Sequence, residues 1–263
     1  MLAIKEQIRK IVVKSGNGGA VWVPKDWLGE EVVVILPEKP KLGLHEQVIH
    51  ALAPYLKDVV AVGIYGSHAR HEQTKDSDID VLVITKDKLR LKKQGLDIMS
   101  MTAEQFEKAI VKYPVMYYQI AQEVQPLINS SVLDTFKSVP LKKESFKAYI
   151  KETEEHLQSS RELLELDKLD GTVLKSYSVV YSALLRLRGL FIISCFLEKK
   201  AFTNKKFKEW TVSNGLEHFD KLYEIYRLVR DNKKITVSIE LPQVERLLSI
   251  VERMLNTLKE RIW

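Results

Sequence analysis

The sequence predicts an α+β protein with a small N-terminal β-hairpin module, an α/β domain around a mixed sheet, and a C-terminal up-and-down helical bundle. Three observations lead to this fold class. Short apolar runs flank a glycine-rich turn in the first part, strands alternate with helices in the second, and only helical periodicity follows. With 263 residues, the chain is long enough to give such parts their own cores. We place the parts at residues 1–42, 43–139 and 140–263.

The N-terminal part has the composition of a hairpin. Ser15–Gly19 is a glycine-rich turn between apolar runs, and Pro24–Gly29 resembles a short helical turn stopped by glycine. Pro37–Lys41 interrupts the pattern as a linker. We expect Trp22 and Trp27 to pack in the small core rather than stack on bases. The strands predicted here are Lys10–Lys14, Ala20–Pro24 and Glu31–Leu36.

In the middle part an amphipathic helix comes first and buried strands follow. The helix is predicted at Leu44–Leu56, and the strands at Val59–Tyr65, Asp78–Thr85 and Leu96–Met101. From about Leu141 onward apolar residues recur at intervals of three and four, which is typical of packed helices. These helices are predicted at Glu144–Leu166, Thr172–Glu198, Lys205–Val212, Leu216–Asp231 and Pro242–Ile262.

Composition narrows the classes of protein. Hydrophobic residues make up 45% and charged residues 29%, which excludes a disordered chain. We find no apolar run approaching the length of a membrane span and no signal-peptide core, so we expect a cytoplasmic protein without a membrane partner. The single Cys195 is expected to be a small buried apolar residue. The net charge of +6 permits an anionic partner such as nucleotide or nucleic acid but does not require one.

Most of the chemistry lies between Gly63 and Asp80. The predicted strand ends in Gly66-Ser67, where we expect a helix to start and to present free backbone N–H groups to a triphosphate. Gly66 lets the backbone approach the phosphates closely, and the Ser67 hydroxyl can hydrogen-bond one of them. Arg70, one turn later, is placed either to approach the same phosphates or to brace the loop.

Three aspartates form the predicted metal site. Asp78 and Asp80 stand two apart at the start of a strand, so both carboxylates project from one face of the sheet. Two adjacent acids repel each other unless a cation lies between them, and oxygen ligands favour Mg²⁺ or Mn²⁺. Asp97, on the next predicted strand, would complete a two-metal site and accept a proton from the attacking hydroxyl.

Other interpretations of these residues stay open. An Asp-x-Asp pair alone is common in turns and at strand starts, where it serves solvation or capping. Asp97 alone also fits an acid on the surface of an edge strand. His68 and His71 flank the motif and fit polar surface better than catalysis.

Gly-Ser followed after ten residues by Asp-x-Asp resembles the signature of the DNA polymerase beta-like nucleotidyltransferases, and most closely the minimal prokaryotic members. The resemblance covers about residues 44–139. It implies that Gly66 and Ser67 hold the triphosphate, that Asp78 and Asp80 bind metal, and that Asp97 is the third carboxylate. The family often has glycine after Ala-Arg, where this chain has His71, a departure that affects the loop or the substrate entrance.

Two looser resemblances concern the ends of the chain. Lys175–Leu185 and Leu222–Asp231 are similar to the central and arginine-bearing helices of HEPN domains, the helical bundles of some toxin–antitoxin pairs. No histidine follows Arg230 at the spacing that HEPN ribonucleases need, so we expect no RNA cleavage. Lys14–Pro24 followed by Val32–Ile35 resembles an AbrB-like swapped hairpin, which implies a homodimer more strongly than DNA contact.

The function predicted from the sequence is metal-dependent transfer of a nucleoside monophosphate, AMP from ATP, to a hydroxyl or similar group of a protein or small-molecule acceptor. Attack on the α-phosphate would release pyrophosphate. The alternative is a regulator, derived from a toxin–antitoxin system or binding DNA, whose transferase site is vestigial. Intact Ser67, Asp78 and Asp80 favour the enzyme.

Overall fold

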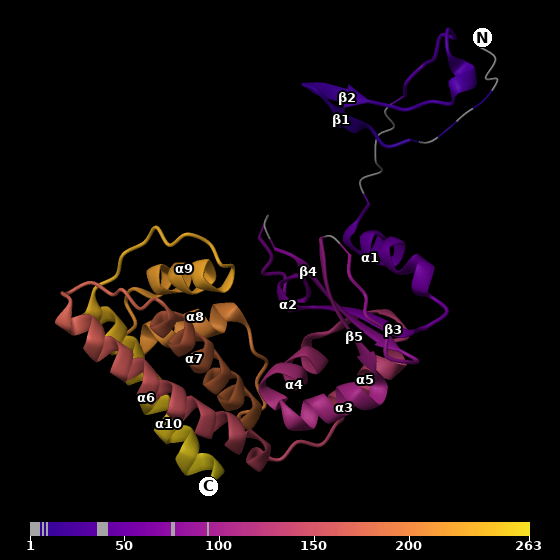
Figure 1. Cartoon of the computed structure of the whole chain (residues 1–263). Helices are drawn as coiled ribbons and strands as arrows, with labels where there is room; N and C mark the ends of the chain where they lie inside the picture. Colours follow the sequence, from indigo (N-terminus) through magenta and orange to yellow (C-terminus); the bar gives the residue numbers. More distant parts are fainter. Residues whose placement is uncertain (1–5, 7, 9, 36–41, 75–76, 94) are drawn as a thin grey trace. The chain divides into compact units, whose positions relative to one another are not determined.

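The structure is a computed structural model that describes residues 6, 8, 10–35, 42–74, 77–93 and 95–263. The chain divides into two compact units, Met1–Leu42 and Gly43–Trp263, which are described separately (Figure 1). Secondary structure comprises a two-stranded sheet in the first unit, and a four-stranded sheet with helices in the second. The α+β fold class predicted from the sequence is therefore confirmed.

The first unit contains a short hairpin. Strands β1 (Val13–Ser15) and β2 (Gly18–Ala20) pair antiparallel around a turn in which Gly16 has a φ of +56°. A 3₁₀ turn, η1 (Lys25–Trp27), follows where a helical turn was predicted. The glycine-rich hairpin turn is thus confirmed.

Three other expectations for this unit are wrong. The second strand ends at Ala20 instead of Pro24, and residues 31–35 form no strand because their backbone pairs with no other described strand. Trp22 is 72% exposed and so does not pack in a core. Leu36 and the predicted linker Pro37–Lys41 lie outside the described residues.

The larger sheet has the strand order β5-β4-β3-β6, and only β4 and β5 run parallel. Three of its strands were predicted: β3 (Val59–Tyr65), β4 (Ile79–Thr85) and β5 (Leu96–Thr102). β6 (Gln125–Ile128) is added at the edge beside β3. Because β4 is central and parallel to β5, residues at the start of these two strands lie at the same edge of the sheet.

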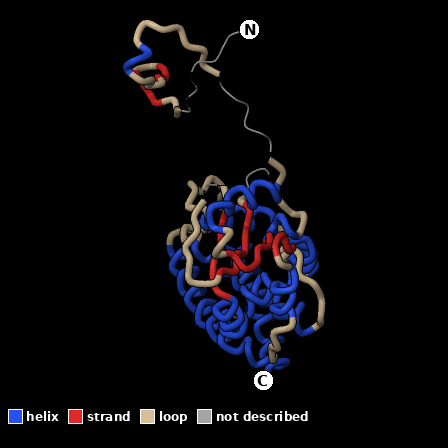
Figure 2. The backbone as a smooth tube through the Cα atoms, turned by 90° about the vertical axis from the view of Figure 1, so that its right-hand side faces the viewer, coloured by secondary structure: helices blue, strands red, loops and turns tan. Residues whose placement is uncertain are grey.

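Helices cover both faces of this sheet (Figure 2). On one face α1 (Leu44–Leu52) packs on Ile79, Val81 and Val83, and Pro54 lies in the 3₁₀ turn η2 (Ala53–Tyr55) that ends the predicted helix early. The opposite face, which carries Leu82 and Ile84, is covered by three helices: α3 (Ala103–Lys112), α4 (Pro114–Glu123) and α5 (Ser130–Lys137). Since side chains alternate along a strand, Asp80 points to the α3–α5 face.

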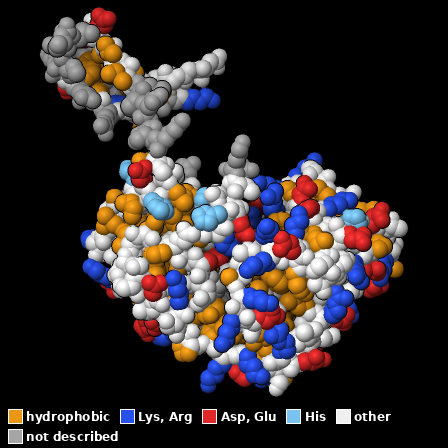
Figure 3. All heavy atoms as spheres, turned by 180° about the vertical axis from the view of Figure 1, so that it is seen from behind, with side chains coloured by type: hydrophobic (Ala, Val, Ile, Leu, Met, Phe, Trp, Pro, Cys, Tyr) orange, Lys and Arg blue, Asp and Glu red, His pale blue; other side chains and the backbone are white. Residues whose placement is uncertain are grey.

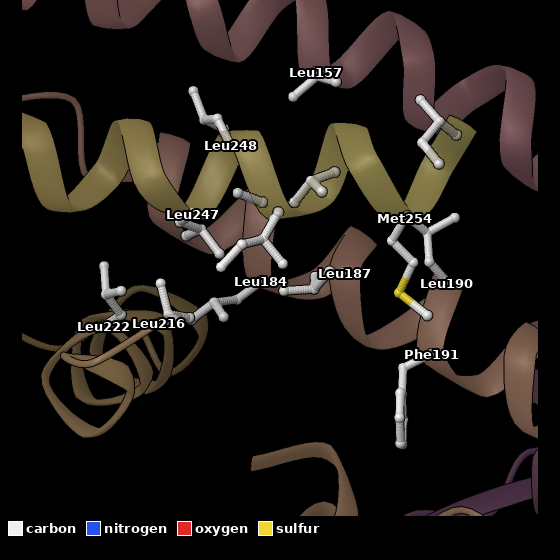
Figure 4. Packing of buried hydrophobic residues seen from close by; sticks show 14 of the residues in the cluster. Leu157, Leu184, Leu187, Leu190, Phe191, Leu216, Leu222, Leu247, Leu248 and Met254 are labelled. Atoms are coloured by element: carbon white, nitrogen blue, oxygen red, sulfur yellow. The ribbon is translucent and has the colours of Figure 1, made fainter. Parts of the chain in front are cut away.

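The C-terminal helices share one apolar core, part of which is drawn in Figure 4. Leu184 and Leu187 of the central helix face Leu247 and Met254 of the last helix within it. Cys195 is free and buried, as predicted. The helices are α6 (Lys147–Leu169), α7 (Ser178–Leu197), α8 (Asn204–Ser213), α9 (Phe219–Arg230) and α10 (Leu241–Ile262), and a short 3₁₀ turn, η3 (Lys143–Phe146), precedes them.

Helix α7 corrects two expectations. It begins at Ser178 instead of Thr172, because the Asp167 carboxylate accepts the backbone N–H groups of Lys175 and Ser176 and holds this segment outside the helix. Contrary to the expectation from the sequence, α7 is also long and apolar enough to span a membrane, the one such helix among the described residues. Sixty-one percent of its most apolar window is buried in the bundle, which is the pattern of a core helix.

Charged side chains are spread over the surface. On the face drawn in Figure 3, lysines and arginines lie interspersed with aspartates and glutamates rather than gathered in one basic patch. The positive charge on this face is therefore not concentrated in a patch of the kind that binds nucleic acid.

Candidate active site

The predicted phosphate loop follows β3 directly. Gly66 starts the short helix α2 (Gly66–Ala69), and its φ of +72° lies in the left-handed region that favours glycine. A Cβ at this position would come within 2.8 Å of Asp80 Cγ, and closer still to the carboxylate oxygen Oδ2. Gly66 therefore serves two purposes: it turns the chain, and it lets the Asp80 carboxylate lie against the backbone of the loop.

The three predicted acids come from two neighbouring strands. Asp80 and Asp97 are register partners in the parallel pair β4–β5, and Asp78 lies just before β4 begins. Asp78 and Asp97 are exposed, whereas Asp80 is half-buried. β5 is an edge strand, so Asp97 is both a surface acid and a neighbour of Asp80. Within the described residues, no three Asp, Glu, His or Cys side chains are already arranged to hold a metal ion.

The charges around Asp80 are predominantly negative. The pKa of Asp80 is raised from 3.8 to about 6, first by burial and then by repulsion from Asp97, Glu123 and Asp78, while Arg70 opposes the shift. Burial, followed by the charges of Asp80 and Asp97, also raises the pKa of Tyr65. Several carboxylates thus act on one half-buried position, which is the environment that a divalent cation relieves.

Glu123, the last residue of α4, is a part of the site that the sequence analysis missed. Its Oε1 accepts the Gly66 N–H at 2.8 Å, and its Oε2 pairs with Arg70 Nη1 at 2.7 Å and accepts Gln119 Nε2 at 2.9 Å. Arg70 Nε also pairs with Glu72 at 2.9 Å. Short-range sequence patterns do not predict this role for Glu123, because Glu123 lies 57 residues from Gly66 in the sequence.

Arg70 has the bracing geometry of the two alternatives drawn from the sequence. Both its ion pairs are largely shielded, with side-chain exposures of 10% for Arg70 and Glu123. Burial acts to lower the pKa of Arg70, but Glu123 and Glu72 outweigh it and raise that pKa. Arg70 therefore ties the predicted phosphate loop to α4, and its own binding of phosphate stays a prediction.

The helical bundle reaches the same network. Glu72 accepts Asn204 Nδ2 at 2.8 Å, and the Arg70 guanidinium lies 5.9 Å from the centre of the Phe202 ring. Both bundle residues were absent from the predicted site, because they lie about 130 residues further along the chain. The predicted phosphate loop is thus held by α4 on one side and by the start of α8 on the other.

The remaining predicted residues lie beside these groups. The hydroxyl of Ser67 has no hydrogen-bond partner in the part of the chain that the structure describes, so it is available to a ligand. His71 has a φ of +57°, which explains physically why a glycine suits this position. His68 Nε2 is buried, and it too lacks a hydrogen-bond partner among the described residues.

Comparisons with known proteins agree with this arrangement. The family model described as polymerase beta, nucleotidyltransferase matches residues 46–145, which include the sheet and all of the predicted acids. A solved structure of a nucleotidyltransferase-like protein from Exiguobacterium sibiricum 255-15 is 12% identical, with a TM-score of 0.38 over 82% of this chain and 75% of that one. No curated protein matches the chain.

The family match and the geometry coincide on the same segment. The matched residues contain the Gly66 turn, the paired strands with Asp80 and Asp97, and the helices α3, α4 and α5 that cover one face of the sheet. Residues 46–145 are therefore a polymerase beta-like nucleotidyltransferase domain.

Proposed function

We propose that this chain transfers AMP from ATP, with the help of Mg²⁺ or Mn²⁺, to a hydroxyl or similar group of a protein or small-molecule acceptor. The observation that carries the proposal is the pairing of Asp80 with Asp97 across β4 and β5, directly against the Gly66 turn. This arrangement puts acidic metal ligands beside a loop suited to phosphate, which is what transfer of a nucleotidyl group requires.

The acids fit a metal that is shared with the nucleotide. Mg²⁺ typically takes one or two carboxylates and fills its other positions with water and substrate phosphates, so a complete set of three protein ligands is not needed beforehand. Asp78 and Asp80 would hold the metal, and Asp97 would be the third ligand. When bound, the metal would neutralise the charge that develops on the phosphates.

The other residues of the site would position the triphosphate and the acceptor. Ser67 would donate its hydroxyl to a phosphate oxygen, and Gly66 would keep the backbone close enough for this contact. Since the Gly66 N–H already donates to Glu123, Gly66 would act through its shape rather than as a donor. Asp97, being exposed, could take the proton of an attacking hydroxyl whenever it does not bind metal.

Calorimetric titration of ATP with and without Mg²⁺ tests the metal and nucleotide site. We expect binding to need the metal and to fall at least about tenfold in Asp80→Asn. The control is Asp134→Asn, which removes an exposed acid of α5 whose one ion pair among the described residues is with Lys137. Metal-independent binding that is undiminished in Asp80→Asn would sink the proposal. Mass spectrometry of candidate acceptors after incubation with labelled ATP then identifies the acceptor.

The same proposal extends to the rest of the chain. The bundle would be a HEPN-like domain that forms one wall of a cleft at the transferase site and does not cleave RNA. The N-terminal unit would be an AbrB-like module that joins two copies of the chain in the cytoplasm. Arg230, on which a HEPN ribonuclease would depend, is engaged by Asp231 at 2.7 Å. Purified protein should therefore leave single-stranded RNA intact, and cleavage that disappears in Arg230→Ala would contradict this assignment.

A further inference from the structure

Arg188, in the middle of α7, has no ion-pair partner in the part of the chain that the structure describes. Its Nε is buried and lacks a hydrogen-bond partner, and no carboxylate of the described residues lies within ion-pair distance of its guanidinium. Arg186, two residues earlier, pairs with Glu152 at 3.3 Å instead. Holding a cation partly out of water is costly unless an anion accompanies it. Arg188 is therefore a cation in need of an anion.

This cation adjoins the wall of the transferase site. The Arg188 guanidinium lies 5.0 Å from the centre of the Phe202 ring, and that of Arg70 lies 5.9 Å from the same ring. Arg70 in turn is held by Glu123, which accepts the Gly66 N–H. A continuous set of contacts thus connects Arg188 with the predicted phosphate loop.

A second polar group, two residues after Phe202 in the chain, also lacks a partner among the described residues. Asn204, two residues later, donates its Nδ2 to Glu72, so its Oδ1 must point away from that carboxylate. This Oδ1 is buried and has no hydrogen bond within the described residues. An amide oxygen accepts hydrogen bonds only, so the group that it lacks is a hydroxyl or N–H donor.

We propose that Arg188, Phe202 and Asn204 form a subsite for the acceptor, and that the acceptor is a phosphorylated alcohol. Its phosphate would bind to the Arg188 guanidinium, which suits planar recognition of phosphate oxygens, and a neighbouring hydroxyl would donate to Asn204 Oδ1. Phe202 would hold the Arg188 guanidinium through its ring face. This inference rests on the proposed function, because it names the substrate class of the same site.

Binding of glycerol 3-phosphate to the full chain, followed by NMR titration, tests the subsite. Arg188→Gln should weaken binding by about tenfold or more, the usual effect of losing a charge-assisted hydrogen bond. Arg186→Gln is the matched control, because it removes an arginine of the same helix that already has a partner. Inorganic phosphate and glycerol should each bind more weakly than the ester. Equal binding by wild type and Arg188→Gln would overturn the proposal.

Asp80→Asn separates this proposal from the proposed function. That variant should lose binding of Mg²⁺–ATP while it retains binding of glycerol 3-phosphate. If glycerol 3-phosphate binding depends on Asp80 and not on Arg188, the probe occupies the transferase site and the subsite is refuted. If even the wild type does not bind Mg²⁺–ATP, while glycerol 3-phosphate binding still depends on Arg188, the transferase proposal alone fails.

Thermal unfolding distinguishes binding from a structural role of Arg188. Because its charge lacks a counterion, Arg188→Gln should melt at the same temperature as wild type or higher, and added glycerol 3-phosphate should raise the melting temperature of wild type only. A lower melting temperature of Arg188→Gln together with an equal ligand-induced shift in both proteins would show a purely structural residue.

Discussion

Gly66 combines a left-handed backbone with close contact to the Asp80 carboxylate. We expect Gly66→Ala to lower transfer about a hundredfold, because a displaced Asp80 misplaces the reacting groups. Gly95→Ala is the matched control: Gly95 has a similar φ, +81°, but a Cβ there would meet no atom within 4 Å. Both variants bear the left-handed cost of about 1–2 kcal/mol. Equal losses of transfer in single-turnover assays would show that the contact with Asp80 is unimportant.

Asp80 predicts an unusual dependence of stability on pH. Its carboxyl has a pKa of about 6 in the fold against 3.8 ordinarily, so the folded state binds the proton more tightly and the charged form destabilises the fold. Without metal, Asp80→Asn should be more stable than wild type at pH 8, and the difference should shrink as the pH falls through 6 towards 4. Urea unfolding in EDTA measures this. A variant that is less stable at pH 8 would contradict it.

His71 occupies a left-handed position at the end of α2, where its φ is +57°. His71→Gly should stabilise the protein by up to about 1 kcal/mol, since glycine adopts this conformation without a Cβ penalty. His68→Gly is the control: His68 lies within α2, where its backbone is helical, so glycine there should destabilise the protein by a similar amount. Melting temperatures that fall for both variants would contradict the explanation.

At the residue scale, the sequence was informative where the chemistry is local. The spacing of Gly66, Ser67, Asp78 and Asp80 was sufficient to bring the phosphate loop and the acids together, because a strand, a turn and a strand connect them. Glu123 and Asn204 could not be found in this way, since only tertiary packing brings them to residues 57 and 132 positions away.

At the scale of helices and strands, the prediction also succeeded where short stretches of sequence determine the structure and failed where distant residues do. β3, β4 and β5 were predicted within two residues because each is a short apolar run, and those of β3 and β4 are buried on both faces. β6 has only four residues, including Pro126, and was not predicted. Residues 31–35 are as apolar as a strand, yet they pair with no described strand. An apolar run therefore predicts that a segment is buried or associates with another surface. It does not predict a strand by itself, because a strand also needs a neighbouring strand to pair with.

Gly189 sets how closely α6 approaches α7. A Cβ at this position would lie within 2.7 Å of Tyr149 Cε1 and closer still to its hydroxyl, which hydrogen-bonds backbone carbonyls of α7. Gly189→Ala should cost about 1–3 kcal/mol through overpacking, despite the better helix propensity of alanine. Combining it with Tyr149→Ala should cost less than the sum of the two single changes. Additive free energies of unfolding would show that the two residues do not compete for space.

At the scale of the whole molecule, the N-terminal unit exposes its apolar residues. No described residue of Met1–Leu42 is buried, and its exposed side chains include Ile11, Leu28 and residues 33–35. Such a surface favours association with a second copy of the unit. We expect the full chain to be a dimer and the chain lacking residues 1–42 to be a monomer by light scattering. A full chain that is already a monomer would contradict this expectation, and so would a truncated chain that remains a dimer.

Helix α7 contacts α6, α9 and α10 within the bundle and α4 of the nucleotidyltransferase domain. Its backbone amides can therefore meet solvent deuterium only when several neighbours separate at once, so their exchange should report the opening of the entire second unit. Amides of β1 and β2, whose residues are largely exposed, should exchange by local fraying within the shortest labelling times. The exchange rate of the slowest amide protons of α7 would then measure global unfolding of the second unit without nucleotide or denaturant.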